Sequence, residues 1–218
     1  MHSPNATQQA YGELQTAYNF FNEKLFNNQL PHCLITLQRK NRARGYFSPE
    51  RFASVDKSIV DEIAMNPMHF ESRTVTETLS TLVHEMVHLW QAHFGKPSRS
   101  AYHNAQWADK MEQLGLMPSD TGKEGGKRTG QQMTHYIITS GPYATAVAEL
   151  LATGLKITWM DRATEKKKQA PRAKYHCDMC NSNVWGKGGL MLMCMACDQE
   201  MEEHQSNIYN IHSTSYNP

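Results

Sequence analysis

His84-Glu85-Met86-Val87-His88 matches the pattern H-E-x-x-H and lies in a run, Thr74 to His93, whose apolar residues recur at helical spacing. One turn of helix separates the two histidines, so both side chains project from the same face. Two such imidazoles can bind one zinc ion, and the glutamate between them can act on a zinc-bound water. The pattern is typical of zinc-dependent peptidases.

The ends of this helix can be predicted from the flanking residues. Thr74 and Glu77 have the spacing of a capping box, which starts a helix. Gly95 and Pro97 are expected to end it. The alternative without a metal is a buried helix that carries two hydrogen-bonded histidines. A third ligand elsewhere in the chain would favour the metal site.

Three later histidines are candidates for the third protein ligand of a catalytic zinc. His93 lies on the same helix, at a rotation that points it away from His84 and His88. His103 follows a break that lets the chain turn back, and it opens a second predicted helix, Asn104 to Leu114. His135 is more distant in the sequence and is the second choice.

The remaining elements are predicted from periodicity and turn residues. Residues 7–27 are predicted as an amphipathic helix, and residues 143–151 as a last helix. Short strands are predicted at 34–37, 45–47, 62–65 and 133–138. Gly115 and Pro118 should end the second helix, and the glycine-rich segment 121–130 should be a loop. A small sheet covering the apolar side of the H-E-x-x-H helix gives an α+β fold.

Two CxxC pairs near the C-terminus predict a second metal site. Its four ligands are Cys177, Cys180, Cys194 and Cys197. Two such turns complete a tetrahedral Cys₄ site, which is saturated and therefore structural. Residues 184–186 and 190–193 are expected to form two strands of a zinc ribbon, joined by Lys187-Gly188-Gly189. A pair of disulfides is disfavoured by the reducing compartment that the composition indicates.

The composition indicates one modest core with a small appendage, since 39% of the 218 residues are hydrophobic. No apolar run reaches the length of a membrane span, and the first residues lack the basic and apolar regions of a signal peptide. An unpaired Cys33 and thiols at metal-binding spacing suit a reducing interior. A cytoplasmic location is therefore expected.

The charge distribution suggests contact with nucleic acid through loops. Because the net charge is only +1, the whole molecule is not a strong polyanion binder. Three basic clusters stand out: Arg39 to Arg44; Lys123, Lys127 and Arg128; and Arg162 to Lys174, which contains Lys166, Lys167 and Lys168. Each cluster alone is more simply a solvated loop or linker. Together they predict weak binding to DNA with little sequence preference.

Three segments and the histidine spacing resemble the SprT family of intracellular zinc metallopeptidases, which includes proteases that digest proteins crosslinked to DNA. The specific part of the resemblance is His84-Glu85-x-x-His88 followed by a third histidine at His103. The weaker matches are Leu25 to Pro31, Arg44 to Phe47 and Ile63 to Pro67. The C-terminal zinc ribbon is a common companion of the family's catalytic domain.

The resemblance implies a minimal zincin-like metallopeptidase domain, formed here by residues 7–160. A basic linker at 161–174, a Cys₄ zinc ribbon at 175–200 and a tail at 201–218 would follow. It also implies that His84, His88 and His103 are the ligands of a catalytic zinc, with Glu85 as the catalytic acid and base. Two zinc ions per chain are thus expected, one catalytic and one structural.

Three functions are compatible with these features. The first is an intracellular zinc endopeptidase acting on proteins, including DNA-associated or DNA-crosslinked ones. The second is a non-catalytic adaptor for nucleic acid or protein, stabilised by two structural metals; Glu85 argues against it, because a structural histidine site needs no carboxylate there. The third is a zinc hydrolase with a non-peptide substrate, which only an assay separates from the first.

Overall fold

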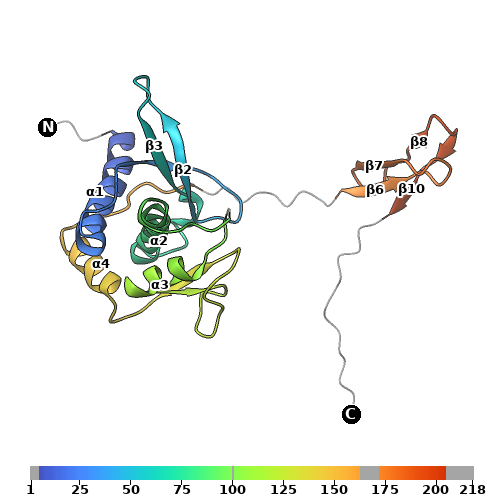
Figure 1. The fold of residues 1–218 in the computed structure, drawn as a ribbon. Coiled ribbons are helices and arrows are strands. Elements are labelled where there is room, and N and C mark those ends of the chain that lie inside the picture. The colour runs from blue at the N-terminus through green and yellow to red at the C-terminus, as the bar shows by residue number, and fades with distance from the viewer. Residues whose placement is uncertain (1–4, 100, 163–171, 205–218) are drawn as a thin grey trace, which may run out of the picture. The chain divides into compact units, whose positions relative to one another are not determined.

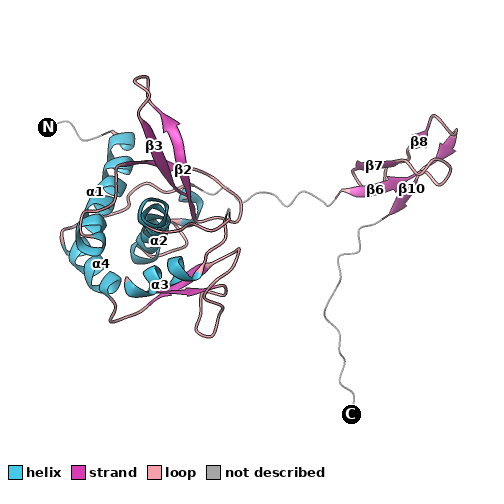
Figure 2. Cartoon of the chain, viewed as in Figure 1, coloured by secondary structure: helices cyan, strands magenta, loops and turns pink. Residues whose placement is uncertain are grey.

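The computed structural model describes residues 5–99, 101–162 and 172–204 (Figure 1). The chain divides into two compact units, Met1–Arg162 and Ala163–Pro218. Within the described residues, the α-helices belong to the first unit and the second unit contains strands (Figure 2). This mixture agrees with the predicted α+β class. None of the described helices has the length and apolar character needed to cross a membrane.

Helix α2 (Val75–Phe94), which carries the H-E-x-x-H motif, is the central element of the first unit (Figure 1). It contacts each of the other helices and the sheet. Those helices are α1 (Ala6–Phe26), α3 (Ala105–Gln113) and α4 (Pro142–Ala152). Leu79, Leu82 and Met86 are completely buried, as their spacing predicts. The motif is therefore anchored in the hydrophobic core.

Both predicted ends of α2 are confirmed. Thr74 Oγ1 accepts a hydrogen bond from the Glu77 backbone N–H at 3.1 Å, and the Glu77 carboxylate accepts one from the Thr74 N–H at 2.9 Å. This is the reciprocal capping box expected from the sequence. At the other end, the Gly95 N–H donates to the Gln91 carbonyl oxygen at 3.0 Å. Both ends of the helix are therefore set by hydrogen bonds between residues that are close in the sequence.

A three-stranded sheet with the order β1-β3-β2 packs beside α2. Its strands are β1 (Cys33–Leu37), β2 (Gly45–Ala53) and β3 (Ile59–Met65). The pairing of β1 with β3 is parallel, and that of β2 with β3 is antiparallel. The β2–β3 hairpin extends away from the body of the unit (Figure 1). Since β3 lies in the middle, β2 has one free edge.

A second antiparallel pair, β4 (Leu116–Ser119) and β5 (Thr134–Ile137), follows α3. Strand β4 differs from the sequence-based prediction, in which Gly115 and Pro118 only end α3. Proline lacks a backbone N–H, but β4 has β5 as its single neighbour in the described sheets, and proline is tolerated at such an edge. The segment between β4 and β5 is a loop, as predicted.

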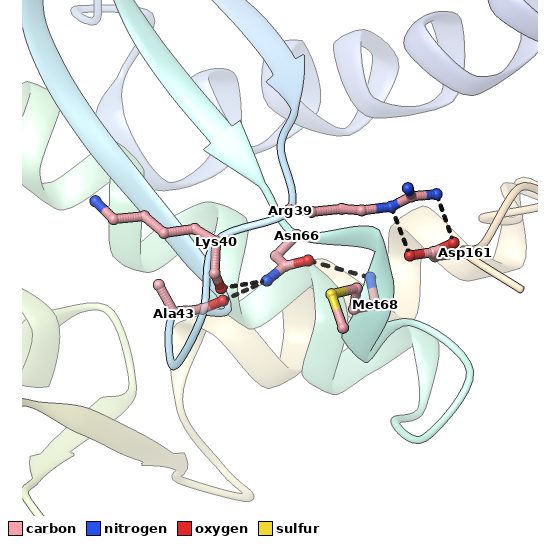
Figure 3. A network of polar contacts seen from close by, with 6 residues as sticks. All are labelled: Arg39, Lys40, Ala43, Asn66, Met68 and Asp161. Atoms are coloured by element: carbon pink, nitrogen blue, oxygen red, sulfur yellow. Dashed lines mark hydrogen bonds and ion pairs between the residues drawn. The ribbon is translucent and has the colours of Figure 1, made fainter. Parts of the chain in front are cut away.

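Asn66 holds the basic loop between β1 and β2 against the short helix η1 (Pro67–His69), as Figure 3 shows. Its side-chain Nδ2 donates to the carbonyl oxygens of Lys40 at 2.9 Å and Ala43 at 2.7 Å. In the same figure Arg39 extends to Asp161, with 2.8 Å between Nε and Oδ2. The loop is thus fixed, and the charge of Arg39 is neutralised by an ion pair.

The second unit contains a three-stranded sheet with the order β10-β6-β7 and a separate β8–β9 pair. The strands are β6 (Ala173–His176), β7 (Asn183–Gly186), β8 (Met193–Cys194), β9 (Gln199–Glu200) and β10 (Glu202–His204). The expected pairing of 184–186 with 190–193 is therefore wrong, because β7 pairs with β6 and β8 with β9. Strand β6 also begins within 161–174, the range assigned to the linker.

Candidate metal centres

Three imidazoles meet at the surface of α2. The ligand atoms of His84, His88 and His103 all lie within 4.8 Å of one another. His84 and His88 come from α2, and His103 from the turn before α3. His88 Nε2 and His103 Nε2 are 3.1 Å apart. A tetrahedral zinc with bonds of about 2.05 Å places two nitrogens about 3.3 Å apart, so this cluster fits the ion.

A polar network in the turn between α2 and α3 brings His103 back to α2. Gln91 Nε2, on α2, donates to Asn104 Oδ1 at 2.8 Å, and the same oxygen caps α3 by accepting from the Trp107 N–H at 3.0 Å. Gln106 Oε1 accepts from the Lys96 N–H at 2.6 Å. Gln91 is only 3% exposed, so its bond to Asn104 is largely shielded from water. His103, the residue before the N-cap Asn104, is thus held beside α2.

Gly130, the last residue of the loop 121–130, also binds His103 through hydrogen bonds. His103 and Gly130 exchange backbone hydrogen bonds of 2.9 Å and 3.1 Å. In addition, His103 Nδ1 lies 3.2 Å from the Gly130 carbonyl oxygen. Because a carbonyl can only accept, this contact puts the proton on Nδ1 and leaves the lone pair on Nε2. Gly130 was missed by the sequence reasoning, since the sequence holds no signal for this pairing.

The two other candidate ligands lie elsewhere. His93 Nε2 is 2.6 Å from Asp61 Oδ2, so it points away from the cluster, as predicted. His135 lies next to the cluster without belonging to the group of three. Its Nδ1 is 3.2 Å from His84 Nδ1, and its Nε2 is 2.8 Å from Ser80 Oγ. His135 therefore contacts one member of the group, His84, without belonging to the group itself.

Trp107 packs against all three candidate ligands. Its ring centroid lies 4.8 Å from that of His84, 5.4 Å from His88 and 4.4 Å from His103. The side chain is completely buried. The sequence gives Trp107 no role beyond its place in the predicted helix Asn104 to Leu114. In the structure it is the rigid apolar wall that limits how the imidazoles can rotate.

The histidines of the cluster are held neutral. Burial, followed by the neighbouring imidazoles, lowers the pKa of His84 well below its usual value. The same causes lower the pKa of His88 to about 3, and burial lowers the pKa of His103. Metal binding requires neutral imidazole with a free lone pair, so the site needs no deprotonation at neutral pH.

Glu85 lies in the same cleft as the three histidines, which has a volume of about 980 Å³. Its side chain is 5% exposed, and burial raises the pKa of its carboxyl group to about 8. A Cβ atom placed on Gly45 would lie 3.0 Å from Glu85 Oε1 and from the Ala64 carbonyl oxygen. Glycine at the start of β2 thus leaves room for the carboxylate, which a larger residue would displace by a few tenths of an ångström.

Not all of the basic residues predicted to contact nucleic acid carry a charge that is free of nearby carboxylates. Arg128 Nη2 lies 2.8 Å from Asp109 Oδ1 and 2.5 Å from Glu112 Oε2, so its charge is balanced by two carboxylates. Lys123 and Lys127 are exposed. Lys166, Lys167 and Lys168 lie outside the described residues. From the first basic cluster, Lys40, Arg42 and Arg44 line the cleft that contains Glu85.

The second centre consists of the four CxxC cysteines. The sulfur atoms of Cys177, Cys180, Cys194 and Cys197 lie within 4.8 Å of one another. Cys180 Sγ and Cys194 Sγ are 3.6 Å apart, and four Zn–S bonds of about 2.3 Å give about 3.8 Å. The described cysteines form no disulfide. A hydrogen bond with the Ser182 hydroxyl lowers the pKa of the Cys180 thiol to about 6, whereas hydrogen bonding with Cys180 raises the pKa of Cys194 and of Cys197, so Cys180 is the first thiolate of the group.

Loss of metal from this Cys₄ centre is expected to unfold the second unit alone. Among its described residues, 172–204, the buried cluster consists of Ala173, Tyr175, Met201 and two of the cysteines, and so small a core usually needs a metal or disulfides. Replacing Cys194 with Ala should collapse the NMR amide dispersion of residues 173–204. Helical circular dichroism should persist, because the described helices lie in the first unit. Cys33→Ala is the control; a dispersed spectrum for metal-free Cys194→Ala would contradict the expectation.

The fold and both centres define an α+β protein with a His₃ group and a Cys₄ group, each able to hold a metal ion. The model of the SprT-like family matches residues 14–135, more than half of the chain. The chain therefore belongs to the SprT-like family. It is also 59% identical, over 58 residues, to an uncharacterized protein in the mucB 3' region of Salmonella typhimurium; the match covers 26% of this chain and 78% of that protein.

Proposed function

We propose that this protein is a zinc-dependent endopeptidase with a zincin-like catalytic domain. The observation that carries the proposal is the position of Glu85: a buried carboxylate that opens on the same cleft as His84, His88 and His103. Three histidines leave one coordination position open, as catalytic zinc sites do, whereas four cysteines leave none. The first centre is therefore assigned to catalysis and the second to structure.

The residues of the cleft divide the chemistry between them. His84, His88 and His103 would hold the zinc, which when bound would supply a Lewis acid that polarises a carbonyl group and acidifies water. Glu85 takes a proton from the attacking water and passes it to the leaving amine of the scissile peptide bond. Its raised pKa, about 8 from burial, suits a group that must both accept and donate a proton near neutral pH.

The free edge of β2 supports a peptide substrate. Residues Gly45 to Pro49, the first part of β2, line the cleft beside Glu85. β2 is an outer strand of its sheet. An extended peptide can pair with such an edge as an added strand, through backbone hydrogen bonds that do not depend on its side chains. This geometry favours a protein substrate over a small molecule.

The charge of the cleft supports substrates that are associated with DNA. Its lining contains four basic residues, Lys40, Arg42, Arg44 and Arg99, and one acidic residue besides Glu85, Asp120. Basic side chains in loops contact phosphates without reading bases, so the binding should be weak and largely independent of sequence. Lys123 and Lys127 extend the basic surface, and the contribution of Lys166, Lys167 and Lys168 stays a prediction.

The second candidate function is a non-catalytic adaptor with two structural metals. A structural His site gains nothing from an adjacent buried carboxylate whose burial raises its pKa, and uncompensated burial of such a group is destabilising. The presence of Glu85 at this position therefore favours catalysis.

The proposal is tested by incubating the zinc-loaded protein with a DNA-binding protein, alone and with single- or double-stranded DNA. We expect cleavage that requires zinc and that DNA accelerates, because binding both partners to one strand raises their effective concentration. No cleavage under any of these conditions would leave the adaptor as the better description.

Neutralising the basic rim of the cleft should weaken DNA binding and flatten its salt dependence. The variant Arg42→Gln/Arg44→Gln removes two charges that line the cleft. Arg51→Gln/Lys57→Gln removes two exposed charges that do not line it and serves as the matched control. Fluorescence anisotropy with labelled DNA at several salt concentrations measures both effects. Equal losses in the two variants, or no binding at low salt, would refute a role of the cleft in DNA binding.

A further inference from the structure

A chain of hydrogen bonds connects the backbone of α2 to the first ligand of the His₃ group. It starts at the Glu77 carbonyl oxygen, which lies 2.8 Å from Ser80 Oγ. Ser80 Oγ lies 2.8 Å from His135 Nε2. His135 Nδ1 lies 3.2 Å from His84 Nδ1. Ser80 is 1% exposed and His84 is 8% exposed, and His135 between them is half-buried at the edge of the cleft.

The carbonyl oxygen fixes the direction of every proton in this chain. A carbonyl can only accept, so the single Ser80 hydroxyl proton points to Glu77. Ser80 Oγ must then accept from His135, which places the proton of that ring on Nε2. The lone pair of His135 is left on Nδ1, where it accepts the Nδ1–H of His84. His84 is thereby left with its lone pair on Nε2.

The opposite direction satisfies fewer hydrogen bonds. If His135 carried its proton on Nδ1, Ser80 would have to donate to His135 Nε2 and would lose its bond to the Glu77 carbonyl. His84 would then carry its proton on Nε2, the nitrogen that keeps its lone pair in the first direction. Of the three contacts, two would remain. In a buried site, where a lost hydrogen bond costs more than in water, the first direction is favoured.

We propose that His135 is a positioning residue of the catalytic metal site: with Ser80, it holds His84 in the orientation and tautomer that offer Nε2 to zinc. The proposal rests on the assignment of His84 as a zinc ligand but does not require peptidase activity. The Gly130 carbonyl performs the same task for His103 through Nδ1. Two of the three ligands are thus fixed by partners from outside α2, one on β5 and one in the loop before it.

The proposal predicts how zinc affinity responds at each position of the chain. Loss of a hydrogen-bond partner behind a ligating histidine typically lowers metal affinity about 10–100-fold. His135→Phe keeps an aromatic ring but removes both nitrogens, so it should show this loss. His135→Gln retains an acceptor for His84 and a donor for Ser80, so it should recover most of the affinity. Ser80→Ala removes only the hydroxyl group that fixes the proton on His135 Nε2. Its loss of zinc affinity should therefore lie between those of His135→Gln and His135→Phe.

Chelator competition on the zinc-loaded full chain measures these affinities. The Cys₄ zinc is the internal reference, because neither His135 nor Ser80 is one of its four ligands. Tyr136→Phe, on the next residue of β5, is the matched control, since Tyr136 does not line the cleft. A His135→Phe protein that folds and binds zinc within about threefold of wild type would overturn the proposal. So would a His135→Gln variant as weak as His135→Phe.

A spectroscopic measurement tests the same idea without any substitution. Nitrogen-15 NMR of the histidine side chains in the zinc-loaded wild-type protein reports which ring nitrogen carries the proton. We expect His135 protonated on Nε2 and His84 protonated on Nδ1. A His135 ring protonated on Nδ1 would overturn the proposal, even if the phenylalanine variant failed to fold. Because neither readout measures proteolysis, the outcome is separable from a failure of the proposed peptidase function.

Discussion

Replacing Glu85 with Gln is expected to abolish proteolysis and to leave the zinc content unchanged. Glutamine has nearly the same shape as glutamate but cannot take a proton from water, and such proton transfers contribute about 10²–10⁴-fold to rates. Glu85 is not one of the three grouped ligands, so the metal should stay. Single-turnover cleavage of a protein substrate and metal analysis of the same sample measure the two quantities.

The matched control for this substitution is Glu71→Gln, which makes the same chemical change at an exposed residue before α2. It should cleave like the wild type. If Glu85→Gln kept more than about a tenth of the wild-type rate, Glu85 would not be the acid and base. If it lost zinc instead, Glu85 would be part of the coordination, and the division of roles in the cleft would be wrong.

Replacing His103 with Ala should remove the zinc of the first centre together with all proteolysis. Two remaining histidines on one helix turn are a weak site, whereas the Cys₄ centre keeps its four ligands, so zinc should fall from two ions per chain to about one. Metal analysis after dialysis against low zinc measures the change. The first unit should stay folded, because His103 is not part of its hydrophobic core.

His135→Ala distinguishes the two histidines that the sequence left as alternatives. At saturating zinc it should retain both ions, because His135 contacts His84 without belonging to the ligand group. If His103→Ala retained both ions while His135→Ala lost one, the third ligand would be His135. Full zinc content in both variants would exclude a three-histidine site altogether.

The parts of the site that could be predicted from the sequence are those set by short-range chemistry. The spacing of His84 and His88 places them on one helix face, and Thr74 with Glu77 starts that helix through its capping box. These contacts span only a few residues, so periodicity and capping rules suffice. The helices α1, α3 and α4 are likewise within a few residues of their predicted ends.

What could not be predicted depends on partners that are distant in the sequence. Nothing in the sequence indicates that β7 pairs with β6, that Gly130 pairs with His103, or that β1 is parallel to β3. Strand β4 was missed because Pro118 is a strong local signal that an edge position overrides. The sequence suggests His135 as an alternative ligand, whereas the structure places it between Ser80 and His84, where it contacts one member of the group.

The turn that returns from α2 to α3 also bears on the order in which the protein folds. All three ligands lie between His84 and His103, and the bonds that join Gln91 to Asn104 and Gln106 span that same short segment. Closing so short a loop costs little chain entropy, and structures with local contacts form fast. If these histidines are the zinc ligands proposed above, the helix pair can bind the ion early, before β5 pairs with β4 and brings His135 next to His84.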